Sequence, residues 1–261
     1  NPFRNANMLF IPYCTGDVHA GANPDGFPGC TRNDQPGDDF PCVHAGFNNV
    51  ALDLEAAKAQ LPPISEVVLA GSSAGGFGAT WNLPQVAAAF PDAGLTLIND
   101  SGPGLDDSVM RPCLQQAWRE VWNLAATLPQ GCTACSEGPG GVSNLHAYLS
   151  EAYPDARLGL VSSAEDEVIR YFFGFGYSDS CTAEADVPAR DYRQGLLNLR
   201  EALGDSWRFF LREGASHPQL LADLSQVAGR DSTGAEVTLA DWLGALADGE
   251  APPADVLVPP P

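Results

Sequence analysis

The sequence predicts an α/β fold in which a mostly parallel sheet carries helices on both faces. Short apolar runs, typical of buried strands, alternate along the 261-residue chain with longer segments of helical periodicity. A Gly-x-Ser-x-Gly turn stands directly between one such strand and the next helix. Since the sequence has neither an internal repeat nor an obvious linker, we expect one domain over residues 1–250 and a Pro-rich tail over 251–261.

The expected strands are short runs rich in Val, Leu, Ile and Phe, bounded by turn residues. In chain order they cover residues 8–13, 66–70, 95–99, 157–163 and 207–212. Residues 14–45 are dense in Gly, Pro, Asp and Asn, which predicts a long loop. Only one expected strand, residues 8–13, therefore precedes the strand that leads into the Gly-x-Ser-x-Gly turn.

The expected helices alternate with these strands. Asn48 or Asn49 is the predicted N-cap of the first helix, which runs to about Gln60 before two prolines. A short helix is expected after residue 163, and longer ones from the serine turn to about residue 90 and at about 112–128, 142–153, 188–203 and 239–247. The helical stretch 105–155 contains tryptophans and is predicted to form a cap over the sheet.

The charge balance excludes several classes of partner. The chain carries 13 Lys and Arg against 33 Asp and Glu, for a formal net charge of −20. A surface this negative repels phosphate backbones, so nucleic acid is not an expected partner, and anionic membranes are disfavoured for the same reason. No apolar run reaches the ~20 residues that a membrane-spanning helix needs. The sequence leaves the oligomeric state open.

Seven cysteines point to an oxidising compartment. They lack the paired Cys-x-x-Cys arrays of a zinc ribbon, so disulfide bonds in a secreted protein are the better interpretation. Cys30 and Cys42 form the best predicted pair; Cys132–Cys135 and pairings of Cys113 and Cys181 are further alternatives. An odd number leaves one thiol without an internal partner.

Gly71-Ser72-Ser73-Ala74-Gly75 has the form and the context of a nucleophile elbow. In such a strand–turn–helix the backbone of the serine is strained and its hydroxyl stands above the sheet edge. The N–H of Ala74, at the start of the helix, is positioned to donate to a developing oxyanion. The alternative interpretation is a Ser- and Gly-rich turn without function.

A serine nucleophile needs a histidine base, which in this architecture lies after the last strand. His217, five residues past the expected end of that strand, fits this place. His146 lies within an amphipathic helix and His44 just before another, so both are interpreted as structural. His19 lies in the loop after the first expected strand, where it either lines the substrate pocket or is a plain loop residue.

Two carboxylates compete to orient the base. Asp100 follows the strand next to the elbow strand, and Asp166 follows the strand after that. The usual place of the acid favours Asp166. Asp100 is then expected to brace a turn near the nucleophile through hydrogen bonds to the backbone.

Other motifs carry weaker signals. The loop 23–39 has candidate calcium ligands, but it lacks the ordered spacing of a known calcium loop, so we expect a solvated acidic loop and no metal. No glycine-rich motif predicts a nucleotide cofactor, and none is expected. Five aromatic residues are available either for an apolar acyl pocket or for the core: Trp118, Trp122, Phe172, Phe173 and Phe175. Among these, Phe172 is assigned to substrate binding together with His19.

Several segments together resemble the pectin acetylesterase family, and most closely its Notum-type carboxylesterase branch. They are residues 5–14, 17–18, 71–76 and 100–102. Beyond about residue 110 the resemblance depends only on the Asp166-Glu167 and Ser216-His217 segments. It implies an α/β-hydrolase fold and a secreted serine esterase with nucleophile Ser73, acid Asp166 and base His217.

The family also has a Gly-Gly oxyanion loop upstream of the residue 5–14 segment, and this chain starts after it. An α/β-hydrolase sheet likewise has several strands before the elbow strand, of which we expect only one here. We therefore expect either that this chain is the larger part of a longer protein or that other elements replace the first strands. Cys14 is then a candidate to pair with a cysteine of the upstream part.

The predicted function is that of a secreted serine carboxylic-ester hydrolase. The resemblance implies acetyl esters on a polysaccharide such as pectin as the first substrate class. Esters of longer acyl chains, or polyesters, are the alternative. A ligand-binding relative without catalytic activity is the third hypothesis, and the presence of all three triad residues argues against it.

Overall fold

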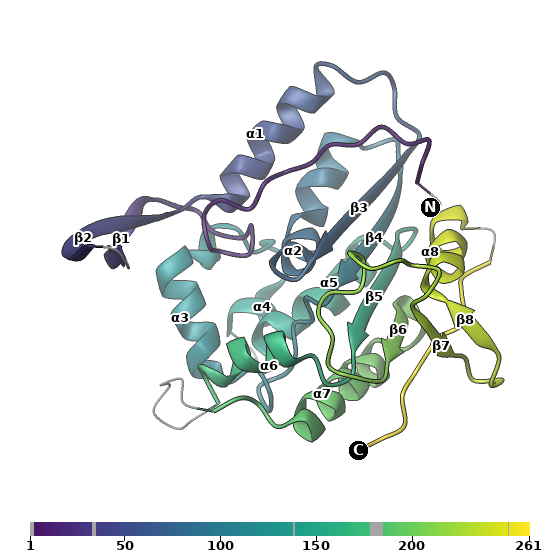
Figure 1. Cartoon of the computed structure of the whole chain (residues 1–261). Helices are drawn as coiled ribbons and strands as arrows, with labels where there is room; N and C mark the ends of the chain where they lie inside the picture. The colour runs from purple at the N-terminus through teal and green to yellow at the C-terminus, as the bar shows by residue number, and fades with distance from the viewer. Residues whose placement is uncertain (1–2, 33–34, 138, 178–184, 250) are drawn as a thin grey trace.

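The computed structural model describes residues 3–32, 35–137, 139–177, 185–249 and 251–261, with side chains except those of residues 28–32, 35–40 and 137. Its centre is a parallel sheet with the strand order β3-β4-β5-β6 (Figure 1). These strands are β3 Glu66–Ser72, β4 Gly94–Asp100, β5 Arg157–Ser163 and β6 Arg208–Arg212. They confirm four of the five predicted strands and the parallel arrangement.

Apolar residues bury both faces of this sheet at β4, β5 and β6, whereas alternate residues of β3 are exposed, including 37% of Val68. Successive strand residues point to opposite faces, so neighbours such as Leu97 and Ile98 belong to different clusters. The cluster on one face includes Leu97, Leu160 and Phe209. The cluster on the other face includes Ile98, Val161 and Phe210. A strand buried on both faces reads as a continuous apolar run, and this made β4, β5 and β6 predictable.

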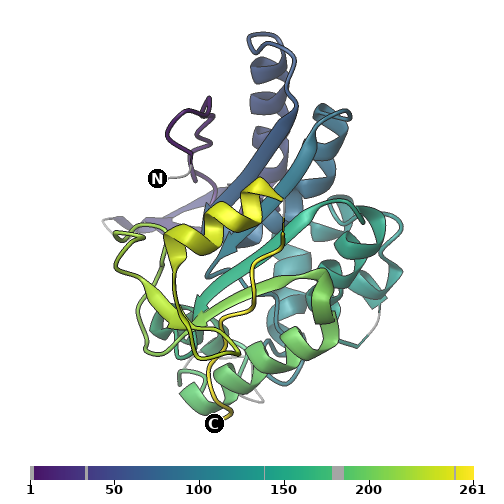
Figure 2. The ribbon, with the colours of Figure 1, turned by 90° about the vertical axis from the view of Figure 1, so that its right-hand side faces the viewer.

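Helices cover both faces. Helix α8, Leu239–Asp248, supplies Trp242, Leu243 and Leu246 to the cluster around Ile98, and Figure 2 shows it crossing the sheet. The cluster around Leu97 takes residues from helices that include α2 Ala74–Ala89, α3 Pro112–Trp122, α5 Asn144–Ala152, α6 Glu167–Gly174 and α7 Ala189–Leu203. Short helical segments complete the stretch before β5: η1 Leu124–Ala126, α4 Thr133–Glu137 and η2 Gly141–Ser143; η3 Gly204–Ser206 precedes β6.

The helix predicted over 112–128 ends earlier, at Trp122. Asn123 follows it in the left-handed conformation, with φ 55°, which ends the α-helix. Leu114 and Leu145, from the stretch 105–155, lie in the same core cluster as Leu97. That this stretch acts as a cap over the sheet stays a prediction.

The strand predicted over residues 8–13 is wrong. The segment is extended but pairs with no described strand, and it exposes 87% of Met8 and 80% of Phe10. The apolar run alone therefore misled, because a strand also needs a hydrogen-bonded neighbour. Ile11 packs on the cluster formed by α1 and α2, and the segment follows these helices in Figure 1.

The loop predicted over residues 14–45 is also wrong in its second part. Strands β1, Asn23–Arg32, and β2, Gln35–His44, form an antiparallel hairpin that projects from the body (Figure 1). Its register is interrupted by bulges. The Ala22 N–H donates to the Trp122 carbonyl at 2.9 Å, which docks the base of the hairpin on α3.

Helix α1, Gly46–Lys58, starts before either predicted cap, Asn48 or Asn49. Its cap comes from a distant part of the chain: the fully buried Asp17 carboxylate accepts the N–H of Gly46 at 2.7 Å. A carboxylate at this place satisfies a helix N–H that has no intrahelical partner, and it complements the helix dipole. Spacing along the sequence contains no signal for such a cap.

The C-terminal residues continue beyond α8 as an extended segment. A short hairpin of β7 Ala228–Arg230 and β8 Glu236–Thr238, which was not predicted, precedes α8. Val256 is fully buried and exchanges backbone hydrogen bonds with β6, to Phe209 and Leu211. The segment thereby covers the outer edge of β6, an edge that would otherwise expose unpaired backbone groups.

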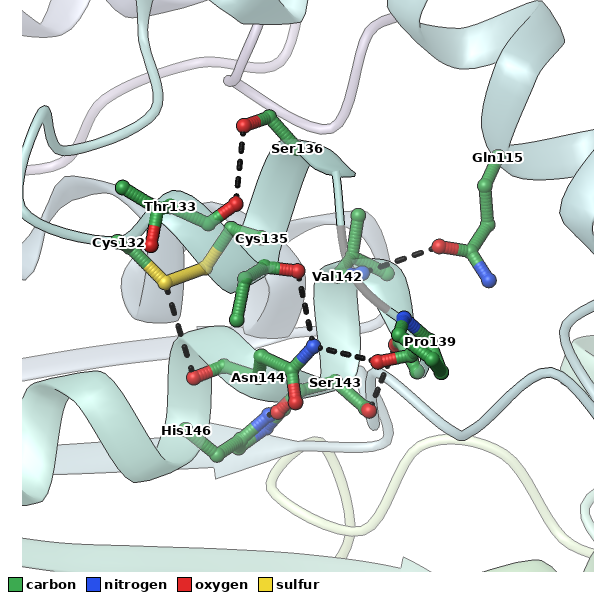
Figure 3. The surroundings of a disulfide bond; sticks show 12 residues. Gln115, Cys132, Thr133, Cys135, Ser136, Pro139, Val142, Ser143, Asn144 and His146 are labelled. Carbon is green, nitrogen blue, oxygen red and sulfur yellow. Dashed lines mark hydrogen bonds between the residues drawn. A yellow bond between two sulfur atoms is a disulfide. The ribbon is translucent and has the colours of Figure 1, made fainter.

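One predicted disulfide is present, between Cys132 and Cys135. Figure 3 shows it beside Asn144, whose amide donates to the carbonyls of Ala134 and Pro139 at 2.9 Å each. Together these contacts hold the short helices before α5 in place.

Cys42 and Cys113 are also disulfide-bonded. Cys30, the predicted partner of Cys42, and Cys181, for which no single partner was predicted, lie outside the described side chains. Cys14 is the free cysteine among the described residues, and it is exposed. Within the described part of the chain, no helix is both long and apolar enough to cross a membrane.

His146 on α5 is a buried structural residue, as predicted. It is 2% exposed, its Nδ1 lies 3.2 Å from the Ser143 carbonyl, and its ring packs on Trp207. Its Nε2 is buried and has no hydrogen-bond partner in the described structure. Burial lowers the pKa of His146 from 6.5 to about 4, so the ring is neutral near pH 7.

This histidine makes stability depend on pH. Between pH 6.5 and about 4 the unfolded chain binds a proton at His146 that the folded protein does not, so stability falls as the pH falls. The shift corresponds to a loss of about 3 kcal/mol across this window. Urea unfolding of the protein and of a His146→Gln variant at pH 7 and pH 4 measures it. The variant is expected to lose less stability on acidification; equal losses would contradict this account.

Candidate active site

The predicted site residues come from one edge of the parallel sheet. Ser73 follows β3, Asp166 follows β5 and His217 lies five residues after β6. Because parallel strands end at the same edge, these connections meet there, and this edge is where open α/β sheets hold their ligands.

The turn at Ser73 has the backbone of a nucleophile elbow. Ser73 has φ 59° and ψ −123°, a conformation that non-glycine residues adopt rarely and at a cost. Its N–H donates to the carbonyl of Asp100 at 2.7 Å, and its carbonyl accepts the N–H of Gly76 at 2.8 Å. The surrounding structure therefore holds the strained residue from both sides.

Glycines on both sides of the serine permit this turn. A Cβ at Gly71 would collide with the carbonyl of Gly75. A Cβ at Gly76 would lie 2.7 Å from the carbonyl of Asp100. Strand β3, helix α2 and the end of β4 approach so closely here that side chains are excluded, which explains the small residues of the motif.

Asp166 and His217 form a hydrogen-bonded pair. Nδ1 of His217 lies 2.7 Å from Oδ2 of Asp166, and both side chains are buried. The other carboxylate oxygen, Oδ1, accepts the N–H groups of Val168 and Ile169 at 3.1 and 3.0 Å, so Asp166 also caps α6. Three donors thus fix the carboxylate, and its bond to Nδ1 leaves Nε2 of His217 as the acceptor nitrogen.

The structure does not join Ser73 to this pair by a hydrogen bond among the described residues. Contacts of this kind are often loose without a substrate and tighten only in the reacting complex. Ala74 is the first residue of α2, where a helix leaves its N–H groups without intrahelical partners. The predicted oxyanion donor is therefore next to Ser73 and available.

His19 lies against the same helix as the nucleophile. Its φ is 57°, its carbonyl accepts the side-chain amide of Asn82 at 3.0 Å, and its Cβ and Cδ2 face Gly78. Burial lowers the pKa of His19, while the nearby Asp17 opposes this shift. A neutral, half-buried imidazole next to α2 is compatible with its predicted role in substrate binding, and that role stays a prediction.

The five aromatic residues considered for an acyl pocket divide into two groups. Phe173 is 1% exposed, and its ring lies 6.2 Å from that of Phe77 on α2; Trp118 lies 5.7 Å from the same ring and stacks on Trp122. These residues pack in or against the core. Phe172 and Phe175 on or next to α6 are instead 59% and 50% exposed.

Some positioning contacts were not predicted. Gln219, two residues after His217, is 1% exposed, and its amide nitrogen lies 2.9 Å from the Ser216 carbonyl and 3.0 Å from the Ser163 hydroxyl. No sequence motif identifies such a residue; only its position after the base could have drawn attention to it. Among the described residues, no group of three or more His, Cys, Asp or Glu is arranged to hold a metal ion. The acidic loop residues Asp34, Asp38 and Asp39 lie outside the described side chains.

A parallel sheet with a strained serine turn after one strand and an Asp–His pair after two others defines an α/β-hydrolase. The chain belongs to the pectinacetylesterase family, whose sequence model matches residues 1–168. This family matches the resemblance that the N-terminal motifs indicated.

Curated relatives agree with this assignment. The chain is 36% identical over 113 residues to palmitoleoyl-protein carboxylesterase notum1a of Danio rerio, and 34% identical over 116 residues to notum1 of Xenopus laevis. Each match covers 41% of this chain, but only 20% and 21% of those relatives. The matched segment thus spans about a fifth of their length.

Solved structures share the fold. The Wnt deacylase Notum from Drosophila superimposes with a TM-score of 0.63 and 17% sequence identity, covering 100% of this chain and 74% of that one. A second crystal form of the same protein gives 0.56 and 19%, covering 92% and 66%. At these identities the likeness shows the fold alone.

Proposed function

We propose that this protein is a serine carboxylic-ester hydrolase that acts through Ser73, His217 and Asp166. The observation that carries the proposal is the 2.7 Å hydrogen bond between Asp166 and His217 at the sheet edge that also bears the strained Ser73 turn. An Asp–His pair with a purely structural role would not require a strained serine turn at the same edge of the sheet, so the combination favours catalysis. Membership of the pectinacetylesterase family supports the same reaction.

In the proposed reaction His217 Nε2 takes the proton of the Ser73 hydroxyl as its oxygen attacks the ester carbonyl. Asp166 keeps the proton of the imidazole on Nδ1 and stabilises the ring when it becomes charged. His217 then returns the proton to the leaving alcohol, which departs and leaves an acyl group on Ser73. Water, deprotonated by His217, hydrolyses this acyl-enzyme and restores the free serine.

The Ala74 N–H donates to the oxyanion of each tetrahedral intermediate in this scheme. One such donor is worth about 10²–10³ in rate when it is removed from a serine hydrolase. An α/β-hydrolase uses a second backbone donor from a loop that precedes the elbow strand.

The proposed substrate is an acetyl ester on an extracellular polysaccharide such as pectin. Two observations support a short acyl group: the family match, and the packing of Phe77 against Trp118 and Phe173, which fills the space next to the first turn of α2. Esters of longer acyl chains are the second candidate. The exposed rings of Phe172 on α6 and Phe175 just after it, six and nine residues after Asp166 in the chain, favour this second candidate.

Secretion is proposed from the cysteine chemistry. Cys132 and Cys135 form a disulfide bond with each other. Cys42 and Cys113 each take part in a disulfide bond as well. Such bonds persist in extracellular and periplasmic compartments and are rare in a reducing cytosol.

Acyl-chain selectivity tests the substrate proposal. We expect hydrolysis of the 4-nitrophenyl esters of acetate, butyrate and octanoate to fall in this order. The value of kcat/KM for acetate should exceed that for octanoate by about tenfold or more, because a filled apolar site excludes extra methylenes. Initial rates from released nitrophenolate, corrected for spontaneous hydrolysis, provide the measurement.

The other outcomes favour the other hypotheses. A preference for octanoate would contradict the acetyl proposal and favour a long-acyl carboxylesterase. Absence of turnover with all three esters, in folded protein, would favour the ligand-binding relative.

A further inference from the structure

A second buried carboxylate, Asp100, lies at the end of β4 next to the proposed site. Its side chain is inaccessible to solvent and accepts hydrogen bonds from two hydroxyls, those of Ser72 at 2.8 Å and Ser101 at 3.0 Å. It also accepts the backbone N–H groups of Gln219, at 3.0 and 3.1 Å, and Leu220, at 2.9 Å. No cation among the described residues pairs with it.

Three of these four donor residues come from two segments that the proposed reaction must hold in register, and the fourth, Ser101, is the neighbour of Asp100. Ser72 directly precedes the nucleophile Ser73, whereas Gln219 and Leu220 follow the base His217 by two and three residues. The sequence separation from Asp100 to Gln219 is 119 residues, so nothing local fixes this arrangement. Among the described residues, Asp100 is therefore the side chain that bonds to both the elbow segment and the segment after the base.

The contacts require a carboxylate. Oδ1 accepts from Ser101 and Gln219, and Oδ2 accepts from Ser72, Gln219 and Leu220. Both oxygens thus face a backbone donor. An asparagine in either orientation would turn its NH₂ group toward one of them, so rotation of the amide cannot rescue the contact. A buried donor left facing a donor is unfavourable.

Asp100 is not the acid that orients the base, because Nδ1 of His217 is bonded to Asp166. Burial raises the pKa of Asp100, and the hydrogen bonds from Leu220, Gln219, Ser72 and Ser101 oppose that shift. A carboxylate only accepts hydrogen bonds, so Asp100 can bind the donors of four residues at once: Ser72, Ser101, Gln219 and Leu220.

We propose that Asp100 is a positioning residue that fixes the segment carrying His217 against the Ser73 elbow. The inference rests on the proposed hydrolase function and adds a residue that acts through the base and the nucleophile without touching substrate. Since misplacement of reacting groups by about 1 Å costs about 10² in rate, loss of this contact should lower kcat with little effect on KM.

The test compares Asp100→Asn with Asp255→Asn. Asp255 is a matched control, because its carboxylate also accepts a backbone N–H, that of Phe209 at 2.9 Å, and an Arg200 guanidinium at 2.8 Å. Asp255 lies near the start of β6, at the opposite end of the strands from the proposed site. Steady-state hydrolysis of 4-nitrophenyl acetate and urea unfolding are measured for both variants. We expect kcat to fall about 10²-fold in Asp100→Asn, KM to change by less than about threefold, and kcat to be unchanged in Asp255→Asn.

A second readout does not need activity. The ring signals of His217 in histidine-labelled protein, assigned with a His217→Gln variant, report the environment of the base by NMR. They should shift or broaden in Asp100→Asn and stay unchanged in Asp255→Asn. The NMR measurement supports or contradicts the positioning role even if the wild-type protein hydrolyses no ester. A wild-type protein without ester hydrolysis would reject the hydrolase proposal separately.

Equal kcat in folded Asp100→Asn and wild type, or unchanged His217 signals, would overturn the inference. Equal losses of kcat in both Asp variants would overturn it too, because they would indicate general destabilisation. If Asp100→Asn does not fold, Ser72→Ala removes only the link to the elbow. It should lower kcat by a few-fold and leave KM unchanged; an unchanged kcat would then contradict the proposal.

Discussion

Replacing Ser73 by alanine is expected to lower kcat for ester hydrolysis by about 10⁴–10⁶, to the background of the assay. The alanine lacks the only atom that the proposed reaction joins to the acyl group, so no acyl-enzyme forms. The substitution should leave the fold intact, because alanine keeps the Cβ at the strained φ of 59°, and the Ser73 hydroxyl makes no hydrogen bond among the described residues. Stopped-flow or steady-state rates with 4-nitrophenyl acetate measure the loss.

The neighbouring serine provides the matched control. Ser72 differs from Ser73 by one position in the same turn, but its hydroxyl donates to Asp100 and is not free to attack. Ser72→Ala should therefore retain at least about a tenth of the wild-type kcat. Wild-type turnover in Ser73→Ala would reject Ser73 as the nucleophile, and abolition of activity only in Ser72→Ala would assign that role to its neighbour.

Replacing Asp166 by asparagine should lower kcat by about 10⁴. Oδ1 of Asp166 accepts the N–H groups of Val168 and Ile169, so the oxygen of an asparagine must stay at that position. Its NH₂ group then faces Nδ1 of His217, which must become an acceptor. The imidazole proton moves to Nε2, and this tautomer cannot take the proton of Ser73.

Two outcomes would contradict this assignment. Retention of more than about a tenth of kcat in folded Asp166→Asn would remove Asp166 from the acid role. A complete loss in Asp100→Asn together with such retention would transfer the role to Asp100, the other carboxylate that the sequence offers. Rates at saturating 4-nitrophenyl acetate, with unfolding curves for each variant, separate these cases.

The strands β4, β5 and β6 were predictable because burial on both faces leaves a direct mark on the sequence. The centres of β4 and β5, Leu95–Ile98 and Leu158–Val161, are mostly apolar, and the predicted limits of both strands agree with the structure to within a residue. Residues 8–13 show the limit of this argument. The run is just as apolar, but no described strand lies beside it, and sequence pattern contains no information about the partner.

The hairpin β1–β2 was missed for the opposite reason. Its strands contain prolines, glycines and aspartates and lack alternation, so they match a loop by composition. Backbone hydrogen bonds between the two strands form nonetheless, with bulges where the register shifts. The cap of α1 by Asp17 was equally hidden, since it joins residues that are far apart in the sequence.

The positions of the candidate site residues were predictable where topology fixes them. A serine turn after β3, and an acid and a base after later strands, must converge when the strands are parallel, so Asp166 and His217 could be chosen by position alone. What holds them could not be chosen in this way. The contacts of Asp100 and Gln219 with the segment around His217 depend on how that loop folds back over the sheet edge, and no local pattern encodes it.

Mass-spectrometric mapping of a serine-directed fluorophosphonate tests the central claim, an activated Ser73, most directly. An activated serine reacts with such a probe, whereas an ordinary one does not. We predict a single adduct per chain on the peptide that contains Ser73, strongly reduced labelling in His217→Gln, and none in Ser73→Ala. Absence of an adduct on the folded wild-type protein, or an adduct on another residue, would contradict the claim.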